Sequence, residues 1–136
     1  MFNRETEYAL RSLVYIKLQN SKNRRPGAVE IARETGAPHF YIAKILQRLA
    51  REGFIESVKG KGGGFYFDPG KPDLTLKELI TFIEGDRSFS GCGFGLKQCD
   101  ENNPCPFHEK YAPIRRSLDN LLSEETVQSL ANGVRL

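Results

Sequence analysis

The sequence predicts a mainly α-helical chain with one small β-hairpin, and three observations support this prediction. Apolar residues recur at helical spacing in three successive segments, from Asn3 to about Asn20, over 28–35 and over 39–52. Two short β-prone runs, at 54–58 and 65–67, flank a glycine-rich stretch, which is typical of a hairpin. Two helices, a tight turn, a third helix and a glycine-tipped hairpin together predict a winged helix-turn-helix.

The first two helices have recognisable ends. Asn3 is the expected N-cap of the first helix, because a short polar side chain can accept a hydrogen bond from the first turn. In the second helix, Val29 and Ala32 are expected to face the core, and Gly36 ends the helix. A tight Gly-Ala-Pro link then leads into the third helix.

The third helix has the clearest pattern. Ile42, Ile45, Leu46 and Leu49 follow the i, i+3, i+4, i+7 spacing of one helical face, and Gly53 ends the segment. The remaining face is polar and basic, which suits the major groove of DNA, although a lone basic face is often merely solvated. The candidate DNA-contacting residues on it are His39, Tyr41, Lys44, Arg48 and Arg51.

The hairpin tip is glycine-rich and basic. Lys59 and Lys61 point to a polyanion as partner, and Gly62 and Gly63 would let the backbone approach it closely. The alternative is that the glycines only allow a tight hairpin turn and that the tip contacts no partner. The stretch lacks the Lys-Ser/Thr that follows the glycines of a nucleotide-binding P-loop.

The second half of the chain is less regular. Thr75 is expected to cap a fourth helix that ends at Gly85, and residues 86–107 lack helical periodicity. A helical pattern resumes near His108, with a restart or kink expected at Pro113, and Ser123 is expected to cap a short final helix. This last helical region has an apolar stripe beyond the domain core, which favours pairing with a second copy of the chain. The residues of the stripe are Ile114, Leu118, Leu121 and Leu122.

We therefore expect three parts. Residues 1–85 would form the DNA-binding domain, residues 86–107 a cysteine loop, and residues 108–136 a dimerisation helix with a C-terminal arm.

Composition excludes several classes of protein. With 136 residues, 39% hydrophobic content and a net charge of +3, the chain fits one compact domain rather than a polycation that binds by bulk charge. The sequence contains no apolar stretch of membrane-spanning length and no signal peptide, so we expect a cytoplasmic protein. We find no nucleophile–base grouping or Cys-x-x-Cys redox pair, and therefore expect neither an enzyme nor a small-molecule substrate.

The three cysteines lie together in the irregular loop. Cys92, Cys99 and Cys105, with His108 three residues later, provide three thiolates and an imidazole. An odd number of cysteines excludes a fully disulfide-paired chain. From spacing alone, an iron-sulfur cluster, tetrahedral zinc and a two-cysteine redox switch all stay open, as does a small metal-cysteine redox protein.

The helix-and-wing segment resembles the Rrf-two family of bacterial winged-helix regulators, which includes IscR-like and NsrR-like iron-sulfur sensors. The residues that carry the resemblance are Tyr41-Ile42 through Leu49, Gly53-Phe54-Ile55, Ser57-Val58-Lys59-Gly60 and Gly62-Gly63-Gly64-Phe65. The resemblance extends over nearly the whole chain. It implies a homodimer, a long dimerisation helix after the cysteine loop, and repression or activation at palindromic promoter sites on double-stranded DNA. Repression is our expectation.

The resemblance also favours an iron-sulfur cluster on the three cysteines that senses iron-sulfur status, redox state or nitric oxide. IscR-like members imply His108 as the fourth ligand, whereas NsrR-like members imply an acidic residue at the position of Glu7. We expect His108 with a 2Fe-2S cluster, and a 4Fe-4S cluster is the alternative. Two departures limit the comparison: the spacing from Cys92 to Cys99 is one residue longer than usual, and Ala43-Lys44 replace an acidic and an amide residue.

Overall fold

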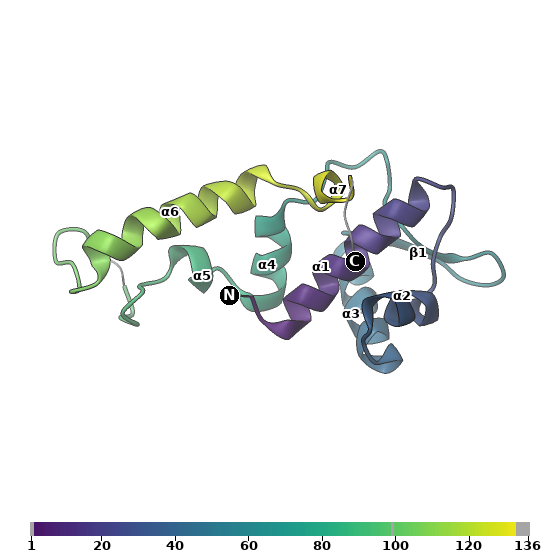
Figure 1. Ribbon diagram of the computed structural model, residues 1–136, viewed down its shortest axis with the longest axis horizontal. Coiled ribbons are helices and arrows are strands. Elements are labelled where there is room, and N and C mark those ends of the chain that lie inside the picture. The colour runs from purple at the N-terminus through teal and green to yellow at the C-terminus, as the bar shows by residue number, and fades with distance from the viewer. Residues whose placement is uncertain (1, 99, 133–136) are drawn as a thin grey trace. The chain divides into compact units, whose positions relative to one another are not determined.

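The computed structural model describes residues 2–98 and 100–132 as a mostly helical chain with one two-stranded antiparallel sheet (Figure 1). This confirms the predicted fold class. The chain forms two compact units: one comprises Phe2–Leu74 with the described residues from Thr126 onward, and the other comprises Thr75–Glu125. No helix in the described ranges is both long enough and apolar enough to cross a lipid bilayer.

The first unit contains the predicted winged-helix elements. They are α1 (Arg4–Asn20), α2 (Ala28–Thr35), α3 (His39–Glu52), β1 (Glu56–Val58), β2 (Gly64–Tyr66) and the short α7 (Val127–Leu130). Asn3 caps α1 as predicted, because its side chain accepts a hydrogen bond from the Thr6 N–H at 2.8 Å. Gly36 and Gly53 end α2 and α3 with φ of 73° and 89°, a left-handed conformation that glycine adopts without strain.

The core of this unit lies between α1, α2 and α3. It includes fully buried Leu13, Ile31 and Leu46. The prediction that Val29 faces the core is wrong, because its side chain is 64% exposed. The buried face of α2 is set by Ile31, and at ~100° per residue Val29 lies about 200° around the helix from it.

The wing is an antiparallel hairpin in which Glu56 pairs with Tyr66 and Val58 with Gly64. Its second strand is attached to the loop between α1 and α2, because the Phe65 N–H donates to the Pro26 carbonyl at 2.9 Å. Asn20 adds a second attachment, accepting from the Phe67 N–H at 2.9 Å. Both attachments hold the second strand of the wing, β2.

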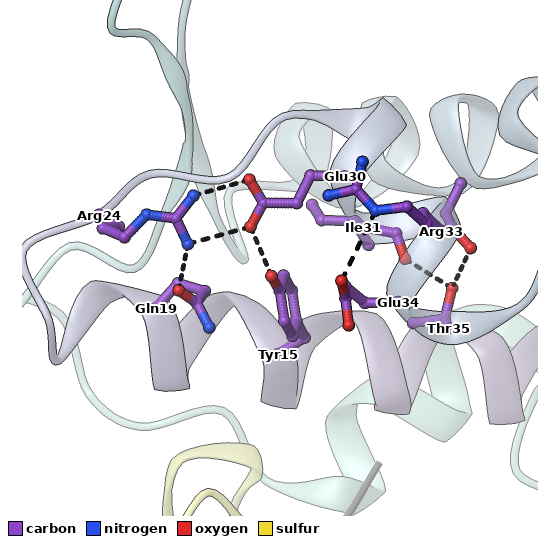
Figure 2. Close-up of polar contacts among 9 residues, drawn as sticks. Tyr15, Gln19, Arg24, Glu30, Ile31, Arg33, Glu34 and Thr35 are labelled. Atoms are coloured by element: carbon purple, nitrogen blue, oxygen red, sulfur yellow. Dashed lines mark hydrogen bonds and ion pairs between the residues drawn. The ribbon is translucent and has the colours of Figure 1, made fainter.

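A polar network fixes the same loop to α1 and α2 (Figure 2). Arg24 donates to both carboxylate oxygens of Glu30, at 2.8 and 3.1 Å, and also to Gln19. The Tyr15 hydroxyl donates to Glu30 as well. The hydrogen bonds from Arg24 and then from Tyr15 lower the pKa of Glu30, in opposition to its partial burial. Glu30 of α2 therefore accepts hydrogen bonds from both α1 and the loop between α1 and α2, and so joins these three segments.

The second unit contains α4 (Leu76–Glu84), α5 (Arg87–Ser90) and α6 (His108–Glu124). Thr75 caps α4 as predicted, because its side chain accepts from the Glu78 N–H at 3.1 Å. The short helix α5 was not expected, since the sequence has no helical periodicity there. Helix α6 continues through Pro113 as one element.

The predicted start of the final helix is wrong. Helix α6 extends to Glu124 and includes Ser123, so Ser123 is not a cap. Thr126 caps α7 instead, and its side chain accepts from the Ser129 N–H at 2.9 Å. Ser and Thr have similar capping tendencies, so sequence alone does not separate two positions three residues apart.

Candidate DNA-binding surface and cysteine site

Helix α3 presents one row of exposed side chains. At ~100° per residue, these positions fall within about 60° of one another, on the side opposite buried Ile42 and Leu49. We call this the outer row, and it consists of Phe40, Lys44, Gln47 and Arg51. Two of the predicted DNA-contacting residues, Lys44 and Arg51, belong to it.

The other predicted residues of α3 lie beside the outer row. His39 is exposed at the first position of the helix. Tyr41 is half-buried and packs edge-on against Tyr8 of α1, with ring centroids 5.7 Å apart. Arg48 forms an ion pair with Glu5 of α1. These contacts hold the flank of α3 against α1.

Sequence reasoning missed two members of the outer row, Phe40 and Gln47. The available signal was the helical spacing itself, since Phe40 precedes Lys44 by four residues and Gln47 follows it by three. Neither side chain is charged, so the basic pattern of the helix does not indicate them. Glutamine can nevertheless pair with adenine in the major groove.

The wing and α3 enclose a groove of about 380 Å³. Arg51 lines it from the helix and Lys59 lines it from the wing, so two predicted DNA-contacting cations share one recess. Ser57 also lines the groove and adds a hydroxyl donor. This arrangement fits a phosphate group.

The two glycines of the wing tip differ. A Cβ at Gly63 would lie 2.1 Å from the Val58 carbonyl oxygen, so the close turn of the hairpin itself requires glycine there. Gly62 has φ of 78°, and nothing lies within 4 Å of the place that a Cβ would take, while Lys61 beside it in sequence is exposed. The tip at Lys61 and Gly62 is thus the more accessible part of the wing.

Two of the three predicted cysteine ligands are close together in the second unit. The Sγ atoms of Cys92 and Cys105 are 3.7 Å apart, and Cys99 lies outside the described residues. In the part of the chain that the structure describes, no group of three or more His, Cys, Asp or Glu side chains is close enough to hold a metal ion.

Backbone N–H groups surround the Cys92 sulfur. Hydrogen bonds from the backbone of Leu96, and to a smaller extent Phe94 and Gly95, lower the pKa of the Cys92 thiol, while its burial acts in the opposite direction. The Cys105 side chain lowers this pKa as well. Such a set of donors stabilises a thiolate, which is the form that ligates metals.

The cysteine loop is fastened to α6. The Arg115 guanidinium donates to the Gly91 carbonyl at 2.7 Å, next to Cys92. Gly93 packs so closely on Tyr111 that a Cβ there would lie 2.5 Å from the ring. The part of the loop from Gly91 to Gly93 is therefore attached to α6.

The two candidates for a fourth ligand lie in different compact units. His108 is the half-buried first residue of α6, and its backbone N–H donates to the Cys105 carbonyl at 3.1 Å. Glu7 is exposed in the first turn of α1. His108 is thus joined to Cys105, a predicted ligand, through one turn of backbone.

Comparison with known proteins identifies the family. The model of the Rrf2 (Rrf-two) family, described as an iron-dependent transcriptional regulator, matches residues 2–133. A putative HTH-type transcriptional regulator from Aquifex aeolicus is 27% identical over 134 residues, which cover 97% of this chain and 92% of the relative. The HTH-type transcriptional repressor NsrR of Streptomyces coelicolor is 28% identical over 113 residues, covering 83% and 71%.

Solved structures show the same fold. CymR, the global cysteine regulator of B. subtilis, matches with a TM-score of 0.78 at 19% identity, covering 99% of this chain and 98% of CymR. T. potens IscR matches with a TM-score of 0.72 at 17% identity, covering 98% and 88%. Since the family model spans almost the entire chain, the protein belongs to the Rrf2 family of winged-helix transcriptional regulators and is not an enzyme.

Proposed function

We propose that this regulator is a cytoplasmic homodimer that binds promoter DNA as a repressor and senses iron-sulfur status, redox state or nitric oxide. Its cofactor would be an iron-sulfur cluster held by Cys92, Cys99 and Cys105, with His108 as the fourth ligand. The observation that carries the proposal is the 3.7 Å separation of the Cys92 and Cys105 sulfurs beneath a set of backbone N–H groups.

This separation fits two ligands of one tetrahedral metal ion. With metal–sulfur bonds of ~2.3 Å and tetrahedral angles, two thiolates on the same ion lie ~3.8 Å apart. An iron of a 2Fe-2S cluster takes two protein ligands, whereas an iron of a 4Fe-4S cluster takes one, so the distance favours the 2Fe-2S form. Zinc would give the same spacing, and the description of the family as iron-dependent supports iron.

His108 is the preferred fourth ligand because it follows Cys105 by one turn and belongs to the same compact unit. Glu7 is the alternative. A bound iron-sulfur cluster would exchange electrons and react with oxidants and nitric oxide. Thiols alone do not offer the same chemistry. Cys92 follows α5 and Cys105 precedes α6, so a group held by both cysteines joins the ends of these two helices.

The DNA-binding part of the proposal rests on α3 and the wing. The outer row would enter the major groove, and the groove shared by Arg51 and Lys59 would bind the phosphate backbone. In functional terms, residues 1–85 would bind DNA, residues 86–107 would sense, and residues 108–136 would dimerise. The proposed DNA-contacting residues are His39, Tyr41, Lys44, Arg48, Arg51, Lys59, Lys61, Gly62 and Gly63.

The dimer would form through α6, whose Ile114 and Leu121 side chains are 65% and 52% exposed. They are seven residues apart and therefore share one face of the helix. In a C2 dimer the same patch on each subunit would bury the other.

A thiol switch is the second candidate function. Two thiols 3.7 Å apart need to approach by less than 2 Å to reach the ~2.05 Å of a disulfide bond. A two-electron oxidant such as a peroxide would take up the electrons and protons that the thiols lose, and no metal is then required. The structural neighbour described as a global cysteine regulator illustrates that this fold serves other signals.

Anaerobic purification of the full chain separates these functions. We expect a coloured protein with iron and acid-labile sulfide, and loss of both in Cys92→Ser, Cys99→Ser and Cys105→Ser. Colourless protein with bound zinc, or metal-free protein, would contradict the cluster. Comparing His108→Ala with Glu7→Gln identifies the fourth ligand, because only the true ligand's variant loses the wild-type visible spectrum.

Promoter binding tests the sensing step. Cys105→Ser should bind DNA with the affinity of the apo protein under all redox conditions, while the affinity of the wild type changes with cluster content. Lys59→Ala and Lys61→Ala should each reduce the slope of log affinity against log salt by about one unit. Unchanged slopes would exclude phosphate contacts at these lysines.

A further inference from the structure

We propose that Phe40 determines sequence specificity by packing its ring against the 5-methyl group of a thymine in the major groove. This inference rests on the proposed DNA-binding role of α3 and assigns a role to a residue that charge alone would not indicate. The phenyl ring would recognise an A·T pair through its methyl group, without a hydrogen bond.

The first support is exposure. The Phe40 side chain is 68% exposed, more than any other large apolar side chain in the described ranges of the chain. A single exposed apolar residue is common on protein surfaces, so exposure alone would not assign a role. The position of Phe40 in the helix supplies the further argument.

Phe40 begins the outer row of α3. It is the second residue of the helix, and Lys44, Gln47 and Arg51 continue the row toward the groove beside the wing. In helix-turn-helix proteins the N-terminal residues of the recognition helix contact base edges. Phe40 is therefore at the end of the row that comes closest to the bases.

The neighbours of Phe40 decide what can cover it. The rest of the outer row carries Lys44 and Arg51, and Lys59 lies across the adjoining groove, so the surface is complementary to a polyanion. A second protein chain that covered Phe40 would have to desolvate these cations. Among the major-groove edges of the four bases, only thymine offers an apolar group.

Two side chains on the flank of α3 also contact α1. Tyr41 packs on Tyr8, and Arg48 pairs with Glu5, so these two side chains are held against α1. The attachments fix the rotation of α3 about its axis. Phe40 then points away from the core, and its ring is available to a ligand.

The test uses a duplex selected from random DNA by the full-length protein. Each thymine is replaced in turn by deoxyuridine, which removes the methyl group and leaves base pairing intact. Wild-type protein should lose about fourfold in affinity at one thymine of a half-site, the value expected for one buried methyl group. Phe40→Ala should bind the original duplex more weakly and should show no loss at that position.

Two further variants serve as controls. Phe40→Leu keeps an apolar side chain and should retain part of the sensitivity to deoxyuridine. Val29→Ala removes a comparably exposed apolar residue, 64% exposed on α2, and should leave both affinity and deoxyuridine sensitivity as in the wild type. Thermal unfolding of all variants verifies that the fold is retained.

Several outcomes would overturn the proposal. They are equal deoxyuridine losses in wild type and Phe40→Ala, a selected site without a sensitive thymine, or a change of oligomeric state in Phe40→Ala. If the wild-type protein selects no duplex at all, the proposed DNA-binding function itself fails. That result is distinguishable from a protein that binds DNA without reading a methyl group through Phe40.

Discussion

The two compact units of this regulator bury their apolar residues to different extents. In the unit that carries α1, α2 and α3, residues such as Leu13, Ile42 and Leu46 are completely buried within the monomer. In the unit of α4, α5 and α6, several large apolar side chains remain 47–65% exposed, namely Phe94, Leu96, Phe107, Ile114 and Leu121. The described residues of the first unit expose fewer large apolar side chains, namely Val29, Phe40 and Val58, whereas the second unit leaves a larger set for a partner that the single chain does not supply.

One acceptor of the first unit is less exposed than the ion pair of the second. The Glu30 carboxylate joins Tyr15 and Arg24 and is 21% exposed, while the Arg24 side chain is 51% exposed. The ion pair of Lys77 and Asp119 in the other unit is 41% and 37% exposed. Since solvent screening weakens exposed pairs, we expect the first unit to be the more rigid element and the second to be the one that a signal can rearrange.

Leu46→Ala should have the largest effect on stability. Removing a fully buried leucine from the core of the DNA-binding unit should lower the free energy of unfolding by about 3 kcal/mol, because a cavity remains. Urea denaturation followed by circular dichroism measures this. Val29→Ala, at a position 64% exposed, is the matched control and should change it by less than ~0.5 kcal/mol. Similar losses in both variants would contradict the assigned core.

The exposed face of α6 should control dimerisation. Replacing Ile114 and Leu121 together by serine should raise the dimer dissociation constant about a hundredfold, ~2.7 kcal/mol, because both lose apolar burial between subunits. Sedimentation equilibrium measures this constant. Arg116→Ser, an exposed change two residues along the helix and so on a different face, should have little effect. An unchanged dimer in the double variant would exclude this interface.

Glu30→Gln should lower the free energy of unfolding by about 1 kcal/mol at pH 7, since two donors lose a charged acceptor. The pKa of Glu30 in the folded protein is lowered from its ordinary value of 4.5, so its contribution is fully present above that value. The contribution disappears as pH falls through the lower folded pKa. The difference between wild type and Glu30→Gln should therefore shrink in acid.

Glu34→Gln is the control for this experiment, because Glu34 is 46% exposed and its pairing with Arg33 is 3.6 Å long. It should change stability little at either pH. If Glu30→Gln and wild type unfold identically at pH 7, the network of Figure 2 does not stabilise the fold.

Sequence patterns predicted the first unit well because its helices carry local signals. The cap at Asn3, the glycine ends of α2 and α3, and the spacing of Ile42 to Leu49 each depend on residues within one helix. The rotation of α2 was predicted incorrectly at Val29, because which face of a short helix is buried depends on its neighbours.

The second unit and the candidate site were less predictable for the same physical reason. Helix α5 is four residues long, and so short a helix leaves no periodic signal. The pairing of Arg48 with Glu5 joins residues 43 positions apart, and nothing in either residue's local sequence indicates it. The proximity of Cys92 and Cys105 was anticipated from the shared loop, while the backbone donors around Cys92 depend on the folded turn.

The smallest expected effect is the coupling energy of the ion pair between Lys77 and Asp119. Measuring it would test the comparison of polar contacts between the two units. The Lys77 ammonium lies 2.7 Å from Asp119 and 5.3 Å from the centroid of the Phe89 ring, so it connects α4 with α5 and α6. A double-mutant cycle of Lys77→Ala and Asp119→Ala should give a coupling of about 0.5 kcal/mol that falls toward zero in 1 M salt. The coupling of Arg24 with Glu30, measured in the same way, should be larger and less sensitive to salt. A larger coupling at Lys77 would mean that the unit of α4, α5 and α6 is fixed by its own polar contacts, and the proposed signal at the cysteines would then have to act on α6 as a rigid body.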